Sequence, residues 1–138
     1  MKKIILAFLL PLSINAIFAQ KAPAAVQKAF AQKFPTVKKV SYDREKNGDY
    51  EAEFSVNGVE SSANFTADGK WLETEKTIAT TALPAEIVKA IKAQYPTAKI
   101  VGAAQIETLD KGTLYEADLK TGIKKQEVLL DAKGNFVK

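Results

Sequence analysis

Apolar and polar positions along the chain follow two periods, and the order of these periods repeats. Apolar residues recur every four positions in two segments, at Val26, Phe30 and Phe34 and again at Ile87, Ile91 and Tyr95. This spacing predicts one buried face of a helix of about three turns in each segment. Pro23 and Pro84 precede the two segments, and Pro35 and Pro96 follow them. Proline is tolerated in the first turn of a helix and disfavours helical geometry at the residue before it, so these prolines predict where each helix begins and ends.

After each predicted helix the period falls to two, which is typical of half-buried β-strands. We predict strands near residues 37–44, 49–56, 59–66 and 71–78, and again near 99–108, 113–120, 123–131 and 135–138. The clearest alternation, Tyr50-Glu51-Ala52-Glu53-Phe54, returns as Tyr115-Glu116-Ala117-Asp118-Leu119. The chain therefore reads as two tandem repeats, residues 22–78 and 83–138, each a helix followed by four strands. Their short joint, residues 79–82, predicts that they abut as one globular unit.

Turn residues assign the faces of the first repeat. Asn57-Gly58 predicts a two-residue hairpin turn, which pairs four residues with partners on the helix-covered face: Val56 with Val59, Phe54 with Ser61, Ala52 with Ala63, and Tyr50 with Phe65. The opposite face then carries the polar set Glu51, Glu53, Ser55, Glu60, Ser62 and Asn64.

The next turn, at Asp68-Gly69, leaves the direction of Trp71 dependent on its length. A two-residue turn directs Leu72 inward and Trp71, Glu73 and Glu75 outward. A three-residue loop turns Trp71 inward, where it would wrap an edge of the core, as large aromatic residues commonly do.

The second repeat follows the same plan. The residues expected to face the helix are Tyr115, Ala117, Leu119, Val128 and Leu130. Those expected to face outward are Glu116, Asp118, Lys125, Glu127 and Leu129, while Phe136 takes the position that Trp71 holds in the first repeat.

Residues 1–19 have the three parts of a secretory signal peptide: basic Lys2-Lys3, an apolar run over residues 4–12, and a short exit rich in small residues. The apolar run is shorter than the roughly 20 residues that span a bilayer, so a retained membrane anchor is the weaker interpretation. We predict cleavage after Ala19, with Ala16 as the alternative, and no membrane anchor afterwards. The expected location is the periplasm or the exterior, where a chain without cysteine is held by its core alone.

Composition excludes several classes of function. The formal charge of +4 falls to about +2 once Lys2 and Lys3 are removed, and Arg44 is the only arginine, so no nucleic-acid partner is predicted. The absence of histidine and cysteine rules out the usual nucleophilic triads and histidine-rich zinc sites, and no phosphate-binding glycine loop occurs. Carboxylate pairs on an open sheet stay solvated and unsuited to acid–base catalysis, so we predict a non-enzyme without catalytic residues, metal site or cofactor.

The two helix-plus-four-strand units resemble the secreted PepSY-like, β-lactamase-inhibitor-like proteins of Gram-negative bacteria over the whole mature chain. The residues that carry the resemblance are Phe18-Ala19-Gln20, Phe34-Pro35, Tyr95-Pro96, the two Tyr-Glu-Ala-Glu/Asp strands, Asp68-Gly69-Lys70-Trp71 and Lys133-Gly134-Asn135-Phe136. The resemblance implies an α+β fold, with the helices on one face of a broad antiparallel sheet of up to eight strands and the other face open.

The resemblance also implies binding or inhibition through that open face. Inhibitors of the β-lactamase-binding kind present aromatic side chains there, whereas this chain lacks their disulfides and has acidic residues with few aromatics. The resemblance therefore does not extend to β-lactamase inhibition itself.

We expect a binding or inhibitor-like module that meets an unidentified protein or peptide partner. The candidate partner-binding residues are Glu51, Glu53, Trp71, Glu73, Glu116, Asp118 and Phe136. Tryptophan and aromatic residues are favoured as interface anchors. The alternative function is binding of a cation or small ligand by the outward carboxylate pairs. A third interpretation gives these acids no role beyond keeping a solvated sheet face soluble.

Overall fold

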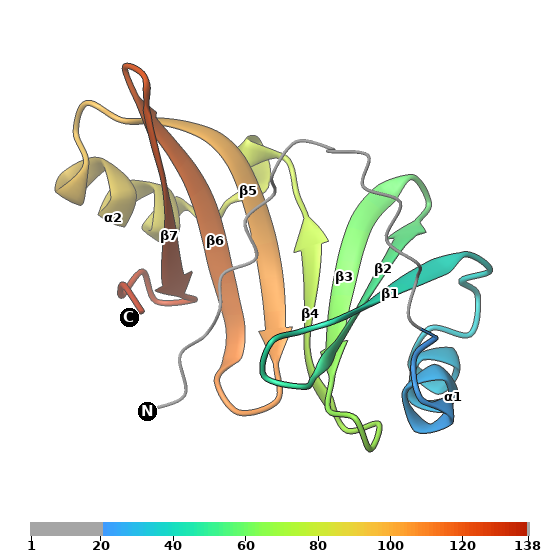
Figure 1. Ribbon diagram of the computed structural model, residues 1–138. Coiled ribbons are helices and arrows are strands. Elements are labelled where there is room, and N and C mark those ends of the chain that lie inside the picture. Colours follow the sequence, from blue (N-terminus) through green and yellow to red (C-terminus); the bar gives the residue numbers. More distant parts are fainter. Residues whose placement is uncertain (1–20, 138) are drawn as a thin grey trace.

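A computed structural model describes residues 21–137, so the expected signal peptide and its cleavage site lie outside the described residues. These residues form one antiparallel sheet of seven strands that follow one another in sequence order (Figure 1). The strands are β1 (Val40–Arg44), β2 (Tyr50–Val56), β3 (Val59–Phe65), β4 (Trp71–Thr77), β5 (Lys99–Thr108), β6 (Gly112–Thr121) and β7 (Lys124–Asp131). The α+β class and the tandem repetition are confirmed.

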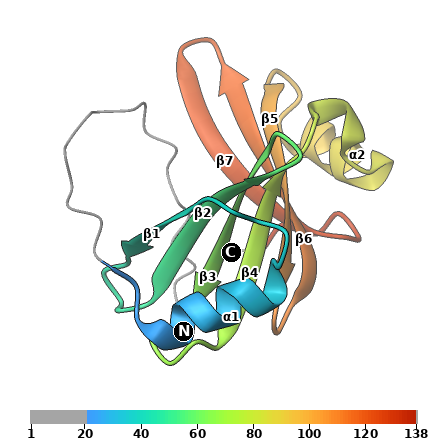
Figure 2. The same ribbon diagram turned by 90° about the vertical axis from the view of Figure 1, so that its right-hand side faces the viewer.

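Two α-helices, α1 (Ala24–Lys33) and α2 (Ala85–Gln94), each follow a proline at the N-cap, and the short 3-10 helix η1 (Thr80–Ala82) leads into α2. Helix α1 lies against one end of the sheet and α2 against the other (Figures 1 and 2). The buried faces of the helices are the predicted ones, Val26 with Phe30 and Ile87 with Ile91.

Both helices cover the same face of the sheet, as the strand register shows. One row of paired residues runs across six strands through Phe54, Ser61, Lys76, Gln105, Tyr115 and Leu130. Phe54 at one end packs in the core beneath α1, and Leu130 at the other end packs in the core beneath α2. Because side chains of one row share a face, the neighbouring row must project from the face that no helix covers.

The predicted hairpin between β2 and β3 is confirmed pair by pair. Val56 pairs with Val59 and Tyr50 with Phe65 at the two ends of the ladder. Asn57 and Gly58 both have positive φ, 52° and 79°, which is the geometry of a type I′ turn. The alternation of apolar and acidic residues is thereby fixed to the two faces of the sheet.

Of the two orientations that the sequence left open for Trp71, the structure has the inward one and not the outward one. Thr66 and Lys70 close a three-residue loop over residues 67–69, with the Thr66 N–H donating to the Lys70 carbonyl at 2.9 Å. The register shifts between Asn64 and Phe65, so that Phe65 pairs with Trp71 and the indole joins the core beneath α1. There the ammonium of Lys33 lies 3.8 Å from the indole centroid, a cation–π contact.

Phe136 does occupy the position equivalent to Trp71, but it also lies on the helix side and not on the open face. Leu130 pairs with Phe136 as Phe65 pairs with Trp71, and the Phe136 ring meets Tyr95 edge-on at a centroid distance of 5.9 Å. This contact is an isolated bridge, so the strand predicted near residues 135–138 does not form within the described chain. Pairing there is limited to the bridge and to two bonds, from the Asp131 N–H to the Asn135 carbonyl at 2.9 Å and from the Val137 N–H to the Leu129 carbonyl at 2.8 Å.

Candidate functional site

The face of the sheet that no helix covers, here called the open face, carries carboxylates from both repeats. One row crosses it through Glu53, Ser62, Glu75, Ile106, Leu114 and Asp131. Seven carboxylates of the open face, from this row and the neighbouring rows, are here called the acidic set: Glu51, Glu53, Glu73, Glu75, Glu116, Asp118 and Glu127. The two Glu-Ala-acid motifs therefore share one surface, with Glu73 and Glu75 of β4 between them.

Polar neighbours hold the carboxylates of the first repeat. The Asn64 side-chain amide donates to Glu73 Oε1 at 3.1 Å, and the Ser41 hydroxyl donates to Glu53 Oε2 at 3.5 Å. Desolvation raises the pKa of Glu51, and a hydrogen bond from Ser62 partly offsets that rise. At this end of the open face the carboxylates thus have side-chain hydrogen-bond donors beside them.

Glu75 lies at the centre of the open face in a less polar setting. It pairs with Ser62 on β3 and with the buried Ile106 on β5. Desolvation raises its pKa to about 7, and the charges that raise it further all belong to carboxylates, first that of Glu73. Close to neutral pH this group is therefore present in both its protonated and its ionised form.

Glu116 is the corresponding group in the second repeat. It pairs with Ala104 on β5 and with Leu129 on β7, both of which are buried. Desolvation is the main cause that raises its pKa to about 8, and the Glu75 charge is the next largest. Strand β5 thus separates two carboxyl groups that resist ionising together.

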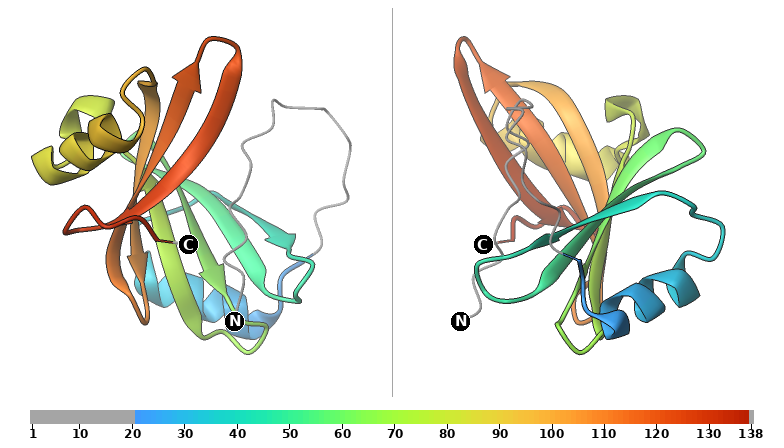
Figure 3. Two further views of the ribbon diagram at one scale, coloured as in Figure 1. Left: turned by 90° about the vertical axis from the view of Figure 1, so that its left-hand side faces the viewer. Right: turned by 45° about the vertical axis from the view of Figure 1, so that its right-hand side comes forward.

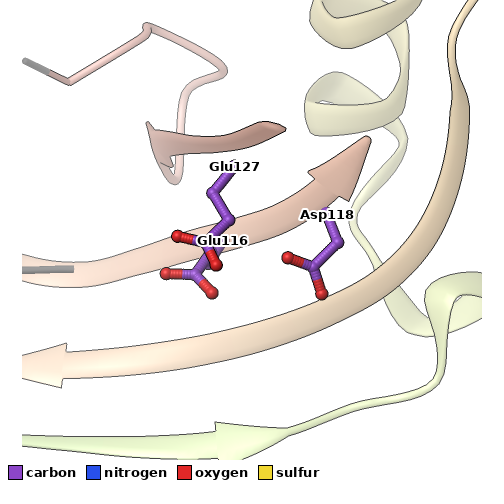
Figure 4. Close-up of side chains that lie close together, drawn as sticks. All are labelled: Glu116, Asp118 and Glu127. Carbon is purple, nitrogen blue, oxygen red and sulfur yellow. The ribbon is translucent and has the colours of Figure 1, made fainter. Parts of the chain in front are cut away.

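Three carboxylates approach one another at the β6–β7 end. Ligand oxygens of Glu116, Asp118 and Glu127 all lie within 4.8 Å of each other. Figure 4 shows the carboxyl groups of Glu116 and Glu127 side by side, with that of Asp118 next to them. Glu127 Oε2 is buried without a hydrogen-bond partner, and desolvation followed by the Asp118 charge raises the pKa of Glu127.

A glycine makes room for one of these groups. An added Cβ at Gly102 of β5 would lie 2.1 Å from Asp118 Oδ2, so the Asp118 carboxylate occupies the space over that glycine. The register of β5 against β6 shifts between Ile100 and Gly102, which brings Gly102 opposite Asp118. Gly102 thus fixes where the Asp118 carboxylate lies.

A small apolar cluster adjoins the carboxylates on the open face. It consists of Ile106, Leu114 and Leu129, with Val137 packed against it. These side chains exclude water from their surroundings, which accounts for the desolvation of Glu75 and Glu116. The open face thus has an acidic and apolar centre beside a hydrated acidic end.

Five of the seven predicted site residues come together on the open face: Glu51, Glu53, Glu73, Glu116 and Asp118. Trp71 and Phe136 lie on the helix side. Sequence reasoning placed Glu75, Glu127 and Leu129 outward without including them in the site, and it did not place Ile106 or Leu114. The alternation in β6 could have placed Leu114, because it is two residues before Glu116 and so points to the same face. Ile106 pairs with Leu114 and therefore points to that face as well.

Comparison with known proteins identifies the family. The model of the family described as "Putative beta-lactamase-inhibitor-like, PepSY-like" matches residues 13–60 and 48–138 in two overlapping segments. No curated protein matches the chain by sequence.

Solved structures share the fold. A protein of Bacteroides eggerthii described as "putative periplasmic" superposes with a TM-score of 0.78 at 20% identity, covering 86% of this chain and 88% of that one. A DUF2874 family protein of Bacteroides uniformis has a TM-score of 0.77 at 19% identity, with 86% and 88% covered. A BLIP-like protein of Bacteroides fragilis has a TM-score of 0.72 at 20% identity, with 86% of both chains covered.

No helix within residues 21–137 combines the length and apolar character needed to cross a bilayer. The family match covers both repeats, and the likeness to the three solved structures extends over most of the chain. The chain belongs to the PepSY-like, β-lactamase-inhibitor-like family.

Proposed function

We propose that the protein is a non-enzymatic periplasmic binding module whose open face receives a protein or peptide partner that carries cationic groups. One observation supports this most strongly. Carboxylates of both repeats gather on the face that the helices leave uncovered, and the charges that raise the pKa of Glu75 and Glu116 are all negative. A lysine or arginine brought to this centre would meet carboxyl groups whose pKa values are raised by neighbouring carboxylates.

Such a partner would gain from two features at once. Its cation would favour the ionised forms of Glu75 and Glu116, whose mutual repulsion and desolvation keep them partly protonated at neutral pH. Apolar parts of the partner would cover Ile106, Leu114 and Leu129, as in interfaces where an apolar centre is surrounded by polar groups. Charge would then select the partner and steer its approach.

A non-enzymatic role is supported by the open form of this surface. The hollow near β1, lined by residues that include Ser41, Glu53 and Glu60, opens widely to solvent. Acid–base catalysis by a pair of carboxylates requires a cleft that holds the substrate between them. Periplasmic location is supported by the signal-like sequence of residues 1–19 and by the description of the Bacteroides eggerthii neighbour. Cleavage after Ala19 rests on the sequence of residues 1–19 alone.

Capture from a periplasmic extract of a Gram-negative bacterium tests the proposal. We expect Glu51→Lys/Glu53→Lys and Glu75→Lys to lose the partners that the unaltered protein retains. Glu86→Lys, on the exposed side of α2, is the matched charge reversal away from the open face and should retain them. Equal capture by all variants would contradict the assignment to the open face, and assays against purified β-lactamases would show whether any captured partner belongs to that class.

Binding of a divalent cation is the second candidate, favoured by the approach of Glu116, Asp118 and Glu127 within 4.8 Å. Calcium prefers carboxylate oxygens, and an ion there would also provide a partner for Glu127 Oε2. Calcium at 100 times its dissociation constant should stabilise the fold by about 2.7 kcal/mol.

Gly102→Ala offers a control for this candidate, because the three atoms nearest the new methyl group all belong to Asp118, whose carboxylate it would displace. We expect a calcium-dependent rise in melting temperature that Gly102→Ala reduces. No rise at millimolar calcium would eliminate cation binding and leave the partner proposal standing.

A further inference from the structure

The outer edge of β7 is only partly covered. In the described part of the chain, β7 is the last strand of the sheet. Its outer backbone is bonded only near its end, through the bridge from Leu130 to Phe136, the Val137 N–H to the Leu129 carbonyl, and the Asp131 N–H to the Asn135 carbonyl. Within residues 21–137 no strand pairs with the outer edge at 124–128. Figures 1 and 3 show this part of the β6–β7 hairpin projecting beyond α2.

The first repeat shows what occupies the equivalent position. There β3 is paired on its outer side by β4, from Ser61 opposite Lys76 to Phe65 opposite Trp71. The bridge between Leu130 and Phe136 reproduces only the last of these pairs. The repeat architecture thus provides a strand position beside residues 124–128 that the described chain does not fill.

The direction of the free backbone groups at this edge follows from the bond to Val137. The Leu129 carbonyl points outward, since it accepts from the Val137 N–H at 2.8 Å. Backbone groups of alternate residues in a strand point to the same side, so those of Lys125 and Glu127 also point outward. These two residues would provide the donors and acceptors for any added strand.

An antiparallel strand with the same sequence would match this edge in charge and in hydrogen bonding. If Gln126 lies opposite Gln126 of a second copy, Lys125 lies opposite Glu127 of that copy, and Glu127 opposite its Lys125. Both residues of each such pair point their backbone groups outward, so each pair exchanges two backbone hydrogen bonds. Each pair also sets an ammonium beside a carboxylate, which favours this register over one that opposes like charges.

We propose that two copies of the protein associate through β7, around a two-fold axis at Gln126, to form one continuous sheet. Val137 occupies the place beside Leu129, so Ile123 of the second copy, whose side chain is fully exposed at 101%, would approach Val137 at each end of the paired segment. Ile123 therefore adds an apolar contact at each end of the paired segment. This edge shares only Glu127 with the acidic set, and the proposal stands without the partner-binding function.

Lysines at a sheet edge have an opposing interpretation, because they also discourage strand pairing. In that case Lys124 and Lys125 would keep the protein monomeric. The two interpretations differ in what they predict for Lys125. If Lys125 prevents strand pairing, its replacement should not weaken association. If Lys125 contacts Glu127 of a second copy, association should depend on the charges of both residues.

Disulfide trapping tests the register in a chain that has no cysteine of its own. Gln126→Cys should crosslink to its own copy, since residues at such a position have Cα atoms about 4.5 Å apart, within the range of a disulfide. Lys124→Cys is the matched control, because two copies of that residue would lie roughly 13 Å apart at the usual rise per residue. Failure of Gln126→Cys to crosslink faster than Lys124→Cys would overturn the register.

Sedimentation velocity of the full mature protein tests the association itself. The unaltered protein should form dimers, Lys125→Glu should weaken them roughly tenfold or more by opposing like charges, and Lys125→Glu/Glu127→Lys should restore them. Melting temperatures of the variants would show that each is folded. A monomer at all concentrations up to about 1 mM, or a Lys125→Glu variant that associates as well as the unaltered protein, would overturn the proposal.

Discussion

Among the neighbouring charges, the carboxylate of Glu75 on β4 has the largest effect on the pKa of Glu116 on β6. The two residues belong to different repeats, and strand β5 lies between them. The tandem sequence motif alone does not produce this relationship. It arises because the pairing of β4 with β5 joins the two repeats into one sheet and aligns the parity of their strands. The open face is therefore a property of the whole sheet and not of either repeat.

Stability should fall as pH rises from mildly acidic to mildly alkaline values. The pKa of Glu75 and of Glu116 is raised from 4.5 to about 7 and about 8, so the folded state holds protons that the unfolded chain releases near pH 4.5. The stability from these groups is present below pH 4.5 and is lost as pH rises through 7 to 8. Urea denaturation at pH 5.5 and 8.5 should differ by ~2 kcal/mol, after allowance for solvent screening of partly exposed Glu116.

Glu75→Gln/Glu116→Gln should remove most of this pH dependence, whereas Glu86→Gln on the exposed side of α2 should leave it unchanged. A double variant with the same pH profile as the unaltered protein would show that other groups cause the dependence.

Gly69 should tolerate alanine less well than Gly48, although both have a positive φ, 89° and 92° respectively. A Cβ at Gly69 would lie 2.6 Å from the Ala25 carbonyl oxygen at the start of α1, while a Cβ at Gly48 meets nothing within 4 Å. Gly48→Ala should cost about 1 kcal/mol from the left-handed backbone alone. Gly69→Ala should cost at least about twice as much, measured by chemical denaturation, and equal losses would argue against close packing of the loop on α1.

Trp71 should contribute to stability and not to binding at the open face. Its indole packs beneath α1, donates a hydrogen bond to the Thr74 hydroxyl at 2.9 Å and receives the Lys33 ammonium on its ring. Trp71→Ala should lower the free energy of unfolding by about 2–4 kcal/mol. Trp71→Phe, the milder variant, should capture partners as the unaltered protein does, and loss of capture in this folded variant would return Trp71 to the binding site.

Local patterns in the sequence determine most of the fold. The four-residue spacing identified both helices. Asn57-Gly58 predicted the β2–β3 register pair by pair, because a two-residue type I′ turn allows only one register between the strands that it joins. The same approach did not settle the direction of Trp71, because Asp68-Gly69 fits a two-residue turn and a three-residue loop equally well. Packing of Gly69 against Ala25 favours the longer loop, and a contact between distant segments leaves no mark in the local pattern.

The candidate site was less accessible to sequence reasoning. Glu51 and Glu116 had a predicted direction, but their presence on one surface depends on the pairing of Thr77 with Ala104 and of Glu75 with Ile106. The raised pKa of Glu116 depends in turn on buried neighbours from two other strands, Ala104 and Leu129. Those neighbours are placed beside Glu116 by the pairing of β5 and β7 with β6, which the local alternation around Glu116 does not reveal.

The central claim is that cationic groups bind at the centre of the open face, between the repeats. NMR titration of isotope-labelled protein with heptalysine at low ionic strength tests it directly. The account predicts that the largest chemical-shift changes fall on Glu75, Glu116 and their neighbours on β5, and that Glu75→Gln/Glu116→Gln weakens binding more than Glu86→Gln. Changes centred on α1 or α2, or equal binding by both variants, would contradict it.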